Sequence, residues 1–141
     1  MKYLKFLLCF IIVYSCANSE TELNLDNRSF VFVACEGNFG ASNGSIHLID
    51  ENGETSSVND IGDVVQSLEV FNNKLFVIVN NSHKIIAYDI TENGLSLPGI
   101  EVSTNGSGPR EMVIVNDNLY FTNWNTNDVK ILNLFNYTIS D

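Results

Sequence analysis

The chain contains two related segments 44 residues apart, QSLEVFNNKLFVIVNN at Gln66–Asn81 and REMVIVNDNLYFTNWN at Arg110–Asn125. Within the segments, the equivalent positions include the pairs Leu68/Met112, Val70/Ile114, Leu75/Leu119 and Asn81/Asn125. The same register continues beyond the segments in the pairs Ile85/Val129, Ala87/Ile131 and Ile90/Leu134. A repeat of roughly 40–45 residues built from short strands is typical of one β-propeller blade. The repeat predicts a scaffold, but a scaffold of this kind can carry many different activities.

The pattern around the repeat is that of an all-β protein. Lys74–Val79 is apolar on both faces, as expected for a strand packed between two neighbouring sheets. No sustained helical period follows the first 15 residues. Tight hairpin turns, which need residues that tolerate positive φ, are predicted at Asn52-Gly53, Asn72-Asn73, Asn93-Gly94 and Asn116-Asp117.

We divide residues 29–141 into three blades, an incomplete one at about 29–62, a second at 63–106 and a third at 107–141. A complete blade is expected to hold four strands, which in the second blade are Gln66–Phe71, Lys74–Asn80, Lys84–Ile90 and Ser96–Val102. The third blade is expected to stop after its third strand, at Asp141. Propellers close with about four to eight blades. We therefore expect a truncated propeller, the first part of a longer protein, and a ring of several chains is the alternative.

The first residues have the pattern of an export signal. Lys2 and Lys5 precede a short apolar run at residues 6–13, which is too short to span a bilayer. The run ends in Val13-Tyr14-Ser15-Cys16, which resembles a bacterial lipobox and marks Cys16 as the lipidated residue. We thus predict a signal peptide at 1–15 and a polar, acidic tether at 16–28. The alternative is an ordinary cleaved signal followed by an incidental cysteine.

The net charge limits the classes of binding partner, and the cysteine content limits the possible disulfides. Without Lys2 and Lys5 the mature chain keeps five basic and 17 acidic residues, a net charge of −12. Such a surface repels nucleic acid and anionic lipid headgroups, so neither is expected as a partner. Cys35 would be the one cysteine left within the domain, in an apolar strand, and we expect a buried, inert thiol without a disulfide partner.

The third blade carries a family resemblance. Its segment Leu119–Asn133, LYFTNWNTNDVKILN, resembles the YVTN-type (YncE-like) β-propeller repeat, in which a Tyr-Val-Thr-Asn strand end is followed by a polar loop and Val-x-Val-Ile-Asp. Phe121 stands here for the valine and Asn133 for the aspartate, whereas Asp89 keeps the aspartate in the second blade. The segment Gly108-Pro109-Arg110 also resembles the Gly-x-Pro opening of such blades.

The first blade adds a second resemblance. Its segment Cys35–Ile46, CEGNFGASNGSI, is similar to the opening blade of surface propeller lipoproteins of Bacteroidetes, and the acidic stretch after Cys16 resembles their surface-export signal. This resemblance implies a lipid-anchored protein of the bacterial outer membrane, on the cell surface or on the periplasmic face. It also implies an outer-membrane transporter as a partner and, by analogy with some relatives, a small nutrient such as cobalamin as the ligand.

Strand direction sorts the loops onto two faces. The loops that leave each second strand and enter each first strand share one face, namely 36–43, 60–65, 80–83, 104–110 and 123–128. Because convergent polar loops around a propeller axis form concave sites, this face is the expected binding surface. The candidate ligand-binding residues are Trp124, Phe39, Asn38, Asn81, His83, Arg110 and Asn125.

Each candidate also has a structural interpretation. Trp124, the single tryptophan, is either a binding hot spot or a ring folded over a neighbouring blade. Arg110 either clamps an anionic ligand or pairs with Glu111 or Asp63. His83 is either a ligand contact or a surface residue, because it has no second metal ligand at a useful spacing.

Three classes of function remain open. The sequence shows no catalytic constellation, metal-ligand cluster or phosphate-binding glycine motif, and it calls for no cofactor. A binding or interaction module is therefore the primary expectation. The alternatives are a propeller enzyme of the lactonase or quinone-dependent dehydrogenase type, with most of its site in other blades, and a purely structural surface role.

Overall fold

The computed structural model describes residues 29–141, and the predicted signal peptide, Cys16 and the tether lie outside this range. The described residues form twelve β-strands and no α-helix, which confirms the all-β class. Within residues 29–141 there is accordingly no helix that could cross a membrane.

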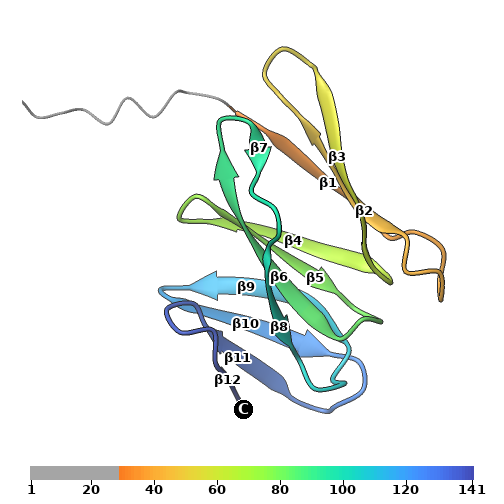
Figure 1. The fold of residues 1–141 in the computed structure, drawn as a ribbon. Coiled ribbons are helices and arrows are strands. Elements are labelled where there is room, and N and C mark those ends of the chain that lie inside the picture. Colours follow the sequence, from red (N-terminus) through yellow and green to blue (C-terminus); the bar gives the residue numbers. More distant parts are fainter. Residues whose placement is uncertain (1–28) are drawn as a thin grey trace, which may run out of the picture.

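The strands form three antiparallel sheets that follow one another along the chain (Figure 1). The first sheet contains β1 (Val31–Cys35), β2 (Gly44–Ile49) and β3 (Thr55–Gly62). The second contains β4 (Val65–Phe71), β5 (Lys74–Val79), β6 (Lys84–Thr91), β7 (Gly94–Leu95) and β8 (Ile100–Ser103). The third contains β9 (Pro109–Val115), β10 (Asn118–Asn123), β11 (Val129–Asn133) and β12 (Ile139–Ser140).

The second sheet is covered on both faces, as its apolar strands predict. The core between the first and second sheets is built around the buried residues Ile46, Leu48, Leu75, Val77, Val79, Ile86 and Tyr88. The core between the second and third sheets is built around Phe76, Ile78, Ile85, Ala87, Leu119, Phe121 and Leu132. Alternate residues of β5 and β6 therefore enter opposite cores, which explains why both faces of these strands are apolar.

The 44-residue repeat is also a repeat of geometry. Leu75 packs in the first core and its equivalent Leu119 in the second, and Tyr88 and Leu132 are related in the same way. The pairing of β4 with β5 shifts register just after Val65, and the pairing of β9 with β10 shifts at the equivalent Pro109. Equivalent positions thus have the same packing and the same strand pairing in successive sheets.

Three expectations need correction. The fourth strand of the second repeat is β8, Ile100–Ser103, rather than Ser96–Val102, because Pro98 has no N–H to donate and the chain turns there. The third repeat does not stop after three strands, since β12 pairs with β11 through Ile131↔Ser140 and Leu132↔Ile139.

The third correction concerns Cys35, which is exposed and not buried. Phe32 and Ala34 point from β1 into the first core, so the alternation of the strand sends Cys35 to the opposite face, where it lies across from Ser45. The apolar sequence of β1 suggested burial on both faces, but β1 is an edge strand of its sheet with one packed face in the described residues.

Candidate functional site

A pocket of about 220 Å³ lies where loops of all three sheets meet. It is lined by Phe39, Asn80, Asn81, His83, Gly108, Trp124 and Asn125. These residues come from four of the five loops that strand direction assigns to one face. The fifth of these loops, 60–65, supplies Asp63, which holds two of the others in place.

The structure brings together five of the seven candidate residues, Phe39, Asn81, His83, Trp124 and Asn125. Asn38 and Arg110 do not line the pocket. Asn38 is used locally, where its backbone N–H donates to Asn43 Oδ1 at 2.7 Å. Sequence reasoning missed Asn80 and Gly108 as lining residues. Asn80 is the 44-residue equivalent of Trp124, and that correspondence is the signal that identifies it.

Backbone hydrogen bonds fix the pocket loops identically in two repeats. Asn80 N donates to Val64 O at 2.8 Å and Asn81 N to Asp63 O at 3.1 Å. Forty-four residues later, Trp124 N donates to Gly108 O at 2.7 Å and Asn125 N to Ser107 O at 2.9 Å. In both sheets, the loop after the second strand is thus hydrogen-bonded to the segment that leads into the first strand of the same sheet. The pocket is consequently held by the regular geometry of the sheets.

Asp63 joins the first loop to the second. The residue is only 4 % exposed, and its two carboxylate oxygens accept hydrogen bonds from Gly40 N at 3.0 and 2.9 Å. Oδ2 also accepts a hydrogen bond from Asn81 Nδ2. The Asp63 N–H in turn donates to Ser82 Oγ at 2.8 Å. A buried carboxylate satisfied by several N–H donors fixes the loop of Phe39 against the loop of Asn81.

The three asparagines that line the pocket use their amide nitrogens in the same way. Asn80 Nδ2 donates to Pro109 O at 2.8 Å, Asn125 Nδ2 donates to Gly106 O at 2.9 Å, and Asn81 Nδ2 donates to Asp63. All three partners are acceptors, so each amide is oriented with its nitrogen toward the protein. The three Oδ1 atoms have no hydrogen-bond partner among residues 29–141.

The two aromatic residues of the pocket are both solvent-exposed. Phe39 is 81 % exposed and Trp124 is 65 % exposed. Arg110 Cζ lies 4.5 Å from the centroid of the Trp124 ring, a cation–π contact on one face of the indole. Arg110 forms no ion pair with Glu111 or Asp63 within the described residues. Its stacking on Trp124 is a third role that the sequence did not suggest.

His83 contributes an unsatisfied nitrogen. It adopts a positive φ of 52° in the loop between β5 and β6, and its backbone carbonyl accepts a hydrogen bond from Thr104 N at 2.8 Å. Its Nδ1 atom is buried and has no partner in the described part of the chain. A buried polar atom without a partner is costly, and His83 is the pocket-lining residue that carries such an atom.

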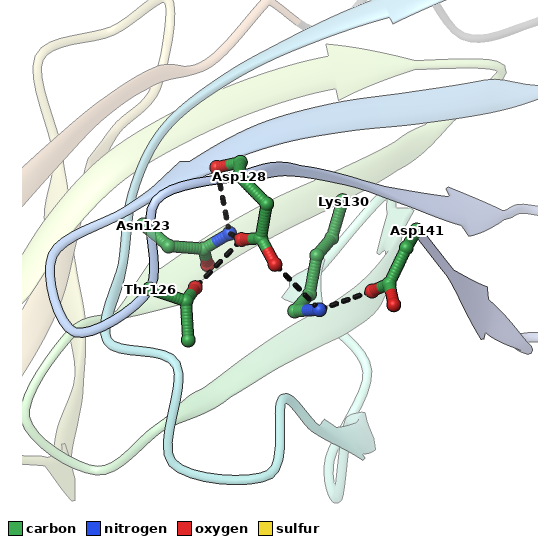
Figure 2. Close-up of polar contacts among 5 residues, drawn as sticks. All are labelled: Asn123, Thr126, Asp128, Lys130 and Asp141. Atoms are coloured by element: carbon green, nitrogen blue, oxygen red, sulfur yellow. Dashed lines mark hydrogen bonds and ion pairs between the residues drawn. The ribbon is translucent and has the colours of Figure 1, made fainter.

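A polar cluster braces the loop that carries Trp124 and Asn125 (Figure 2). Asp128 Oδ1 accepts hydrogen bonds from Asn123 Nδ2 at 2.8 Å and Thr126 Oγ1 at 2.6 Å. Lys130 Nζ lies 3.0 Å from Asp128 Oδ2 and also pairs with Asp141. The Thr126 hydroxyl and the Lys130 ammonium together lower the pKa of Asp128. Asp141 and Asp128 correspondingly raise the pKa of Lys130.

No group of three or more His, Cys, Asp or Glu side chains in residues 29–141 is arranged to hold a metal ion. A search for matching protein families and a search of curated proteins both find no match to the chain.

Proposed function

We propose that this chain is part of a lipid-anchored β-propeller of the bacterial outer membrane whose loop face binds a ligand through the pocket around Trp124. The observation that carries the proposal is that five of the seven candidate residues, from loops of three sheets, line one pocket. Exposed aromatic rings, oriented amides and an imidazole residue around one concavity are typical of a binding site.

The internal repeat supports the propeller. On the outer face of the third sheet, Val113, Val115 and Val129 are 54 %, 50 % and 53 % exposed. Tyr120, Val129 and Ile131 on this face are the 44-residue equivalents of Phe76, Ile85 and Ala87. Phe76, Ile85 and Ala87 of the second sheet are buried beneath the third sheet.

In the second sheet, the equivalent face carries Phe76, Ile85 and Ala87 and is covered by the third sheet. We propose that a fourth sheet covers the third in the same manner, so that the sheets are successive blades around one axis. The apolar side chains on the outer face of the third sheet would then be buried in the same way as those of the second sheet.

The pocket volume suggests how much of a ligand is held. Pockets that enclose a whole drug-sized ligand measure about 300–1,000 Å³, and this one measures about 220 Å³. The pocket therefore fits one ring or side group of a ligand. Neighbouring loops of the same face would contact the remainder, which agrees with a site shared among several blades.

The binding proposal is tested by titrating cyanocobalamin, the ligand class that the resemblance implies, into the full chain and its variants by calorimetry. Trp124→Ala is expected to weaken binding at least about tenfold, because exposed tryptophans are frequent hot spots. Its far-ultraviolet circular dichroism is expected to stay that of a β protein. Phe135→Ala is the control, since Phe135 is 90 % exposed and lines a different pocket. Equal affinity in both variants contradicts the assignment of Trp124.

The anchor is tested separately. Cys16→Ser is expected to release the protein from the membrane fraction, because no acyl chain can then be attached. Retention of the variant in that fraction contradicts the lipid anchor and leaves the binding proposal unaffected.

A further inference from the structure

The charge of the pocket is the first constraint on its ligand. Its lining contains three amides, an imidazole, two aromatic rings and a glycine, with no carboxylate, ammonium or guanidinium group. Asp63, which is bonded to two of the pocket loops, has both oxygens engaged by Gly40 and one also by Asn81. The pocket thus offers no fixed charge to pair with an ionised ligand.

The amide orientation is the second constraint. Asn80, Asn81 and Asn125 each direct Nδ2 to a protein acceptor, which leaves three carbonyl oxygens as unpartnered acceptors among residues 29–141. Carbonyl oxygens bind hydrogen-bond donors and repel anions. A ligand that matches them carries several donors, such as hydroxyl groups.

The aromatic rings are the third constraint. Phe39 and Trp124 offer apolar, electron-rich faces that attract the slightly positive C–H groups of a ring. Arg110 lies over one face of the Trp124 ring and is not among the residues that line the pocket. A cationic ligand that stacks on Trp124 would be repelled by the guanidinium group that already lies over the ring.

From these three constraints we infer that the pocket binds one uncharged sugar ring, through its hydroxyl donors and its C–H face. This inference rests on the proposed binding function and names the ligand class for the same pocket. An uncharged ring of hydroxyl groups satisfies the three amide oxygens, has a flat hydrocarbon side for Trp124 or Phe39, and fits a pocket of about 220 Å³.

Trp124 is the single tryptophan of the chain, so its fluorescence reports directly on the pocket. The full chain is titrated with methyl glucoside, methyl mannoside, methyl galactoside and N-acetylglucosamine as neutral probes. Glucosamine and glucuronate are the matched cationic and anionic rings. At least one neutral sugar is expected to change the emission saturably, and both charged rings are expected to bind at least about tenfold more weakly. Tighter binding of glucosamine, or no saturable response to any neutral sugar, overturns the inference.

Two pairs of variants test the contacts. Asn125→Leu removes an amide acceptor at similar size and is expected to weaken sugar binding at least about tenfold, whereas Asn127→Leu in the same exposed loop leaves it unchanged. Phe39→Ala is expected to weaken it similarly, and Phe135→Ala is again the control. Equal effects within either pair contradict the contact that the pair tests.

The cyanocobalamin titration separates the two proposals. If cyanocobalamin binds in a Trp124-dependent manner and no neutral sugar does, the sugar inference fails and the binding function stands. If neither probe binds, both fail.

Discussion

The guanidinium carbon of Arg110 lies 4.5 Å from the centroid of the Trp124 indole. Arg110 lies at the start of β9 and Trp124 directly follows the end of β10. Trp124 N also donates to the carbonyl oxygen of Gly108, the residue before β9, at 2.7 Å. An arginine that is stacked in this way orients the ring that the pocket presents. The exposed tryptophan is therefore positioned by its own sheet, whether or not a ligand is bound.

Removing this contact has a measurable consequence. Arg110→Ala is expected to lower the free energy of unfolding by about 0.5–1 kcal/mol, the usual size of an exposed cation–π contact. The ring also loses cover on one face, so acrylamide is expected to quench Trp124 fluorescence more strongly. Arg110→Lys keeps the charge without the planar group, and its quenching is expected to lie between that of the wild type and that of Arg110→Ala. Quenching identical to that of the wild type in Arg110→Ala contradicts the stacked arrangement.

Gly62 tests the close packing beneath the pocket loops. It has a φ of +144°, and a Cβ atom there would lie 2.7 Å from both Ser82 Oγ and Val79 Cγ1. Gly62→Ala is expected to cost about 2–4 kcal/mol, from backbone strain and overpacking together. Gly53→Ala is the matched control, since Gly53 has a φ of +82° and no atom within 4 Å of the added Cβ. Urea unfolding is expected to rank Gly62→Ala well below Gly53→Ala in stability, and equal midpoints count against this packing.

Asp63 tests the link between the first and second loops. Asp63→Asn puts an amide nitrogen where one oxygen accepts N–H donors, so at least one buried donor loses its acceptor. The expected cost is about 1–3 kcal/mol, that of an unsatisfied buried group. The control is Asp60→Asn, an exposed residue just before this position in the chain. If both variants unfold at the same urea concentration, Asp63 does not act as the link.

The cluster around Asp128 predicts a pH dependence. Thr126 and Lys130 lower the pKa of Asp128 in the folded chain below its usual 3.8. The ionised carboxylate therefore stabilises the fold above pH 3.8, and this contribution is lost as the pH falls through the lowered folded-state pKa. Asp128→Asn is expected to melt below the wild type at neutral pH, with the gap closing in acid. A gap in melting temperature that stays constant down to the most acidic pH tested contradicts this account.

The regular part of the fold was predictable because the repeat encodes it. Leu75 and Leu119 occupy equivalent places in successive cores, and the Asn72-Asn73 and Asn116-Asp117 turns fall between the strands that the repeat aligns. A strand that is apolar on both faces, such as β5, is expected to be covered on both sides, because either face would otherwise be exposed to water.

Features that depend on one residue or on a neighbour in space were not predictable. The exposure of Cys35 follows from which face of β1 is covered, and an apolar run alone does not reveal that face. The stacking of Arg110 on Trp124 competes with ion pairs that look equally available in the sequence. Asn80 is an intermediate case, because its 44-residue equivalence to Trp124 marks its position in the repeat, whereas the pocket that it lines is completed by Gly108 and Trp124 of the next sheet.

The most direct test of the central claim is a map of amide chemical shifts by nuclear magnetic resonance, recorded while cyanocobalamin and the neutral sugars are titrated into the ¹⁵N-labelled full chain. We expect saturable shifts for the residues that line the pocket, in loops of three sheets, namely Phe39, Asn80, Asn81, His83, Gly108, Trp124 and Asn125. The hairpin turns at Asn72-Asn73 and Asn116-Asp117, which connect strands at the other end of the sheets, should not shift. Shifts confined to those turns, or no saturable shift with any probe, would contradict this expectation.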